Sequence, residues 1–176
     1  IDNCYIHAVT SKEIQQDLNL IGHSVQDGEN KNNDYLTVKN CLLEGGYIGV
    51  NMGGTGYVAL PKEVGGIVEG NTFKNQGSKS IYVQDELGAK IRNNTVIIEA
   101  TADTKMSTGI MDVQLRDEYS EAVEITGNTF NVAPNYYTTA VYLRDMEDDF
   151  MILPVPKLNV EQPHYNTRIH DSCTIS

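Results

Sequence analysis

Ile125-Thr126-Gly127-Asn128-Thr129-Phe130 is a six-residue phrase with four further copies in the chain. The other copies begin at residues 1, 38, 68 and 91, so the phrase recurs at uneven intervals along a sequence of 176 residues. The shared template is a β-branched residue, any residue, Asn or Gly, Asn or Cys, any residue, and an apolar residue. A phrase that returns in this way indicates stacked structural units rather than one closed core.

The third and fourth positions of the phrase predict its backbone shape. The third position is always Asn or Gly, the residues that enter the left-handed region of backbone space at least cost. Each phrase is therefore predicted to be a strand, a sharp bend and a second strand. The fourth position is expected to point inward, where stacked Asn side chains would hydrogen-bond from one repeat to the next. That inward column comprises Cys4, Cys41, Asn71, Asn94 and Asn128.

A second phrase follows in the later repeats. It reads Ile81-Tyr82-Val83-Gln84-Asp85-Glu86, with similar stretches at residues 113–118 and 141–146 and a weaker one at 48–52. Apolar and polar residues alternate, which is the period of a half-buried strand. Together the two phrases predict three strands in every repeat.

A repeat of three strands that contains the Gly-Asn-Thr-Phe motif resembles the right-handed parallel β-helix of the pectate-lyase-like superfamily. We expect an all-β solenoid of about five coils over residues 1–149. After Asp149 the pattern fades and Pro154, Pro156 and Pro163 would interrupt pairing, so residues 150–176 are predicted to be an irregular C-terminal cap or the start of a following segment. Because the chain opens inside a repeat, we expect it to be a segment of a longer protein with upstream coils or a cap.

Composition narrows the classes of partner. The formal net charge is −11, which argues against nucleic acid and against an anionic membrane surface. No apolar stretch reaches the roughly 18 residues of a membrane span. With the resemblance, these properties favour a secreted or cell-surface protein. Cys4 and Cys41 share the inward column, where either a disulfide or two free thiols would fit, and Cys173 has no evident partner.

Alignment of the second phrases predicts columns of outward-facing side chains about 4.8 Å apart. Val83, Leu115 and Leu143 are expected to face the core. The expected outward columns are Tyr82, Gln114 and Tyr142, then Asn51, Gln84, Arg116 and Arg144. A third column, at the strand end, comprises Asp85, Asp117 and Asp145.

These columns predict a polysaccharide-binding surface. Tyr rings lie well against sugar C–H faces, so Tyr82, Gln84, Tyr142 and Asn51 are the predicted substrate-binding residues. Carboxylates are hard oxygen ligands, which makes Asp85, Asp117 and Asp145 a candidate calcium site. The resemblance implies a polysaccharide lyase acting on uronate-containing glycans, with Arg116, Arg144 and Asp117 as the candidate catalytic residues.

Three alternatives remain open at the level of sequence. The solenoid could be a non-catalytic carbohydrate-binding or adhesive module, or a structural spike or fibre. Stacked Asp beside stacked Arg could also serve only to balance charge along an exposed face. A hydrolase of the polygalacturonase kind is disfavoured because its Asn-Thr-Asp and Gly-His-Gly signatures are absent.

Overall fold

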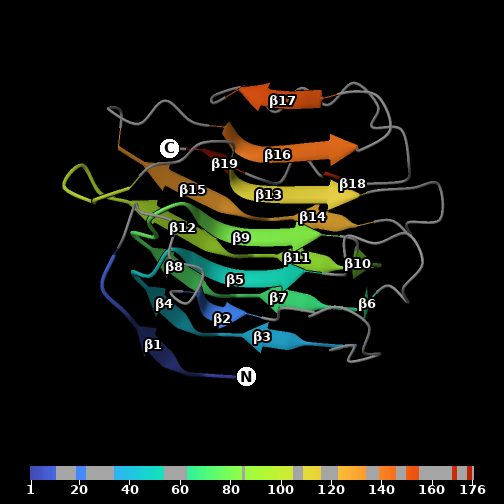
Figure 1. Ribbon diagram of the computed structural model, residues 1–176, viewed down its shortest axis with the longest axis horizontal. Helices are drawn as coiled ribbons and strands as arrows, with labels where there is room; N and C mark the ends of the chain where they lie inside the picture. Colours follow the sequence, from blue (N-terminus) through green and yellow to red (C-terminus); the bar gives the residue numbers. More distant parts are fainter. Residues whose placement is uncertain are drawn as a thin grey trace.

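The protein is built from β-strands that pair almost entirely in parallel (Figure 1). The computed structural model describes residues 1–10, 19–22, 34–53, 63–84, 86–104, 109–115, 123–133, 139–145, 150–154, 168–169 and 174–175. These residues contain no helix, and hence none that could cross a membrane. The predicted all-β class with parallel sheets is confirmed.

Three parallel sheets carry the fold. Sheet A has the order β18 (Arg168–Ile169), β14 (Glu124–Thr126), β11 (Lys90–Arg92), β7 (Ile67–Glu69), β3 (Thr37–Lys39). Sheet B runs β1 (Tyr5–His7), β4 (Leu42–Glu44), β8 (Thr72–Lys74), β12 (Thr95–Ile98), β15 (Thr129–Val132), β19 (Thr174–Ile175). Sheet C runs β17 (Phe150–Pro154), β16 (Thr139–Asp145), β13 (Gly109–Leu115), β9 (Lys79–Gln84), β5 (Ile48–Gly53), β2 (Asn19–Gly22). A small fourth sheet pairs β6 (Glu63–Val64) with β10 (Glu86–Leu87).

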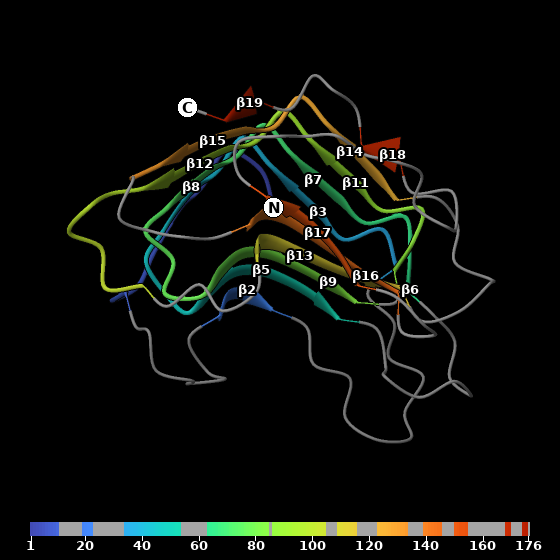
Figure 2. The ribbon, with the colours of Figure 1, turned by 90° about the horizontal axis from the view of Figure 1, so that it is seen from above.

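The chain visits sheets A, B and C in turn, and we call one such round a pass. Strands β3, β4 and β5 form one pass, and the next begins at β7 directly above them. Seen along the stack, the sheets lie on three sides of a common interior (Figure 2). The exception to parallel pairing is β17, which runs antiparallel to β16.

The bends between sheets A and B form as the phrase predicts. The third residue of every copy has a positive φ, between 52° and 67°, at Asn3, Asn40, Gly70, Asn93 and Gly127. The chain turns there through the left-handed region, which Asn and Gly tolerate. The bends are therefore encoded locally in each repeat.

The inward ladder at the next position is confirmed for Cys41, Asn71, Asn94 and Asn128, whereas Cys4 is exposed. The Cys41 N–H donates to Asn71 Oδ1 at 2.9 Å, and the Asn71 and Asn94 N–H groups donate to Oδ1 of Asn94 and Asn128 at 3.0 Å each. At the first pass the acceptor is sulfur, since the Cys4 N–H donates to Cys41 Sγ at 3.4 Å. The ladder satisfies backbone groups that the bend removes from water.

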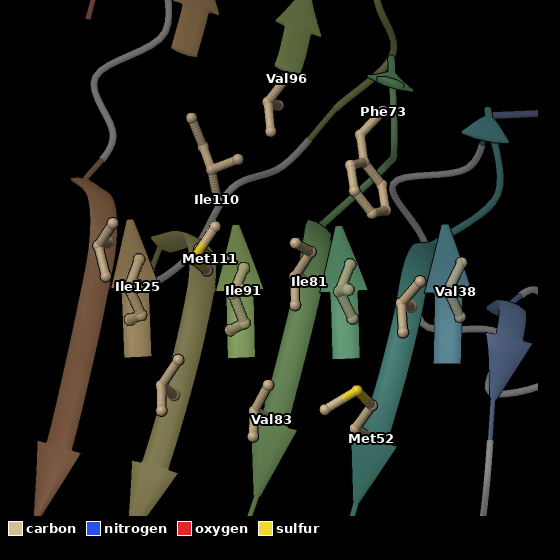
Figure 3. Close-up of a cluster of buried hydrophobic side chains, with 14 of the residues drawn as sticks. Val38, Met52, Phe73, Ile81, Val83, Ile91, Val96, Ile110, Met111 and Ile125 are labelled. Atoms are coloured by element: carbon tan, nitrogen blue, oxygen red, sulfur yellow. The ribbon is translucent and has the colours of Figure 1, made fainter. Parts of the chain in front are cut away.

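The core lies between the three sheets and is filled by apolar side chains from strands of all three. Val68 on sheet A, Phe73 on sheet B and Ile81 on sheet C are all completely buried. Figure 3 shows such side chains converging on the interior from strands of different sheets. Every pass thus buries its own layer, and the layers stack into a continuous core.

Part of the C-terminal segment continues the pattern. Strands β18 and β19 extend sheets A and B in parallel, with Ile169 beside Ile125 and Ile175 beside Phe130. One more residue separates Ile169 from Ile175 than separates Ile125 from Phe130, so this copy does not match the six-residue template. Residues 155–167 lie outside the described part of the chain.

Candidate functional site

Sheet C offers the broadest outer face of the molecule. Its strands β5, β9, β13 and β16 have six or seven residues, whereas those of sheets A and B have two to four. Side chains alternate along a strand, and Met111 and Val113 fill the core. Asp112, between them, and Gln114, after Val113, therefore point away from the core, although both side chains are buried. The outer face of sheet C is the candidate functional site.

The observed register differs from the predicted one by two residues in β13. Asp112, not Gln114, lies between Tyr82 and Tyr142, and Asn51 lies on the other side of Tyr82. The prediction placed Asn51 beside Gln84, where Gly53 lies instead. A shift of two leaves every side chain on its original face, so alternation alone could not distinguish the two registers.

The same shift changes the expected charged columns. Gln114 occupies the level of Gln84 and Arg144, so the predicted pairing of Arg116 with Arg144 at one level is wrong. Leu115 lies beside Asp145 where Asp117 was expected. Asp85, Arg116 and Asp117 themselves lie outside the described residues, and Arg144 and Asp145 are placed by their backbone. Their catalytic and calcium-binding roles remain predictions.

A buried ion pair stands at the centre of the face. Lys79 Nζ lies 3.2 Å from Asp112 Oδ2, and the two side chains are only 16% and 1% exposed. Gln114 Nε2 donates to the other carboxylate oxygen at 3.3 Å, and Lys79 Nζ lies 5.5 Å from the centre of the Tyr82 ring. Burying a carboxylate in this way requires a partner charge and hydrogen bonds, and Asp112 has both.

The sequence prediction missed Lys79 and Asp112. The prediction aligned Val113 with Ile81 and Val141. Aligning Met111 with them, as the structure does, would have placed Asp112 between the two tyrosines. The predicted contact residues are present on the face. Tyr82, Gln84 and Asn51 are half-buried, Tyr142 is buried, and the Tyr82 hydroxyl donates to Gln84 Oε1 at 3.0 Å.

Next to Tyr82 the face contains an unsatisfied acceptor. Asn51 Oδ1 is buried and receives no hydrogen bond, and the same holds for Asn19 Oδ1 on β2. Gly22 is the residue paired with Asn51 on the neighbouring strand β2. The Asn19 side chain packs closely on Gly22, since a Cβ added to the glycine would lie 3.1 Å from the Asn19 Cβ. Buried amide oxygens without donors are uncommon, so the Asn51 oxygen is an available acceptor in this part of the face.

A second polar group lies on the outer face of sheet B. The Tyr5 hydroxyl donates to Glu44 at 2.8 Å, and Lys74 lies 3.2 Å from Glu44 and 3.4 Å from Glu99. The Tyr5 hydroxyl and then Lys74 hold the pKa of Glu44 below its ordinary value, while Glu44 and Glu99 raise the pKa of Lys74. These groups are exposed, so the network contributes modestly to stability and resembles ordinary surface pairing.

Metal-binding geometry is not evident in the described part of the chain. No group of three or more His, Cys, Asp or Glu side chains comes together among those residues. The candidate calcium ligands on sheet C fall on residues whose side chains are outside that part.

Comparison with known proteins gives no family assignment. No protein-family model matches the chain. No curated protein and no solved structure matches it either. Function must therefore be inferred from the chain's own geometry.

Proposed function

We propose that the protein is a secreted or cell-surface right-handed parallel β-helix that binds polysaccharide along the outer face of sheet C. The repeated passage through sheets A, B and C, the bends at Asn or Gly and the Asn ladder all support this fold. They are the features on which the resemblance to the pectate-lyase-like superfamily rests. A fold alone does not define a function, so the proposal depends on the site.

The observation that carries the proposal is the unsatisfied side-chain oxygen of Asn51, which lies opposite Tyr82 on the neighbouring strand. A sugar unit supplies what both groups need, because its hydroxyls donate to an amide oxygen and its C–H face packs on an aromatic ring. The neighbouring Lys79–Asp112 pair is held in place before any ligand arrives. Preorganised polar groups cost little conformational entropy on binding.

The direction of the ligand follows from the pairing. Gly22, Asn51, Tyr82, Asp112 and Tyr142 are successive neighbours across five strands, at a spacing of about 4.8 Å. An extended glycan would therefore lie across the strands and contact the half-buried Asn51 and Tyr82, since Asp112 and Tyr142 are themselves buried. Uronate-containing polymers are the first class to test, because Arg144 continues the neighbouring column beyond Gln114.

Glycan-array screening followed by calorimetry with the best ligand tests the proposal. Tyr82→Ala should weaken binding roughly tenfold through loss of stacking, and Asn51→Leu should weaken it through loss of the acceptor. Tyr5→Ala is the matched control, because Tyr5 is 63% exposed on sheet B, away from the site. Failure of every glycan to bind, or equal affinity of Tyr82→Ala and Tyr5→Ala, would overturn the proposal.

The same preparations decide between binding and turnover. A lyase would release an unsaturated product detectable by ultraviolet absorbance, and Arg116→Ala and Arg144→Ala would abolish it. Binding without product would make the protein a non-catalytic module. A concentration-independent trimer that buries sheet C and binds no glycan would instead favour a structural spike.

A further inference from the structure

The first two inward positions of the ladder are cysteines on adjacent passes. Asp2 pairs with Lys39 and Tyr5 with Leu42, so Cys4 lies directly beside Cys41. Both thiols are free. The neighbouring Asn residues of the column can join passes only by hydrogen bonds, whereas two cysteines at this position could also join them covalently.

The side chains are oriented in the same way along the column. Cys41 Sγ reaches toward the first pass and accepts from the Cys4 N–H at 3.4 Å. Each thiol also donates to the carbonyl oxygen two residues earlier, Cys4 to Asp2 at 3.2 Å and Cys41 to Lys39 at 3.0 Å. Rotation of Cys4 about its Cα–Cβ bond would turn its sulfur toward Cys41. Cys4 is exposed, so that rotation meets little packing.

The distance between the strands permits a bond. Adjacent strands lie about 4.8 Å apart, within the Cα separation of about 4.4–6.8 Å found in disulfides. We propose that Cys4 and Cys41 form a disulfide under oxidising conditions and so lock the first pass to the second.

The reaction requires a disulfide oxidant such as glutathione disulfide. The exposed Cys4 thiolate attacks one sulfur of glutathione disulfide, which forms a mixed disulfide and releases one glutathione thiolate. The Cys41 thiolate then attacks the Cys4 sulfur and releases the second glutathione. Two protein thiols are oxidised and one glutathione disulfide is reduced to two glutathione molecules, while the two thiol protons pass to the released thiolates.

The lock would act at one edge of sheet B as the described strands define it. Strand β1 pairs with β4 alone among the described strands, whereas β4, β8, β12 and β15 have neighbours on both sides. A strand with one partner is held by fewer backbone hydrogen bonds than a strand with two, and so it opens locally more readily. A covalent link between Cys4 and Cys41 restricts that opening without changing the other passes.

Peptide mapping of the full chain carrying Cys173→Ser tests the proposal, because this variant removes the third thiol. After incubation with glutathione disulfide, trypsin should yield a linked pair of peptides covering residues 1–12 and 40–62, lighter than their sum by two hydrogens. Hydrogen exchange at Tyr5–His7 should slow at least about tenfold relative to the reduced protein. Additional Cys4→Ser or Cys41→Ser replacement should abolish both effects.

Two outcomes would overturn the proposal. One is stable glutathionylation of Cys4 while Cys41 remains open to alkylation under denaturing conditions. The other is a disulfide between the Cys4 residues of two molecules. Neither result depends on whether sheet C binds glycan, so the two proposals stand or fall separately.

Discussion

Replacement of Asn94 with Ala is expected to destabilise the protein by about 2–5 kcal/mol. Asn94 is completely buried and is the middle one of the three Asn residues in the ladder. Its Oδ1 accepts from the backbone N–H and from Nδ2 of Asn71, both at 3.0 Å. Its Nδ2 donates to the Val68 carbonyl at 2.9 Å and to Asn128 Oδ1 at 3.0 Å. The substitution removes all four bonds at once.

The magnitude follows from which groups lose their partners. The buried Asn71 N–H has no other acceptor among the hydrogen bonds of the described residues, and leaving it unsatisfied costs about 1–3 kcal/mol. The Asn71 and Asn128 side chains keep part of their bonding, to Val38 and Ile91 carbonyls respectively. Loss of the remaining amide bonds therefore adds only about 1–2 kcal/mol. Asn94→Cys should lose less, because Cys41 shows that a thiol can accept from the backbone at this position.

Urea titration followed by circular dichroism measures the effect, with equal m-values confirming that the same unit unfolds. Asn93→Gly is the matched control, since Asn93 is the adjacent exposed residue and its φ of 53° suits Gly. The control should change stability by less than about 1 kcal/mol. If Asn94→Ala lost no more than Asn93→Gly, the ladder would not stabilise the stack and the reasoning above would be wrong.

Two further predictions concern charge. Lys79→Met should lower the free energy of unfolding, measured by urea titration, by about 3–5 kcal/mol, because it leaves the Asp112 carboxylate buried without the Lys79 charge. The control is Lys39→Met, which breaks the more exposed pair with Glu69 and should lower it by less than about 1 kcal/mol. Equal losses would show that burial of the pair is unimportant. Glu44 has a folded-state pKa below its ordinary value, so its stabilising effect is complete above the unfolded pKa and is lost as the pH falls through the folded one. The stability advantage of the wild type over Lys74→Met should therefore shrink as the pH falls below the ordinary pKa of a Glu side chain, and a constant difference would contradict this assignment.

The features that could be predicted from sequence are those governed by local chemistry. Asn93 and Gly127 turn through the left-handed region because few other residues do so cheaply, and that preference requires no knowledge of the rest of the chain. Asn94 follows such a bend and therefore points inward. The all-β class follows from the same repeated pattern and from alternation in the second phrase.

The candidate site was only partly predictable. Tyr82 and Tyr142 were placed in one outward column, and the structure agrees. The residue between them was predicted to be Gln114 and is Asp112. Lys79, the partner of Asp112, could not be found without that register.

The sequence by itself determined the bends, the ladder and which face of each strand turns inward, because these depend on backbone preference and on side-chain alternation within a few residues. Only the tertiary structure decided how the passes align. A shift of two residues exchanges no inward side chain for an outward one, so local patterns leave both alignments possible. Pairing between neighbouring passes selects Asp112 beside Tyr82, and so brings Lys79 and Asp112 into contact across the strands.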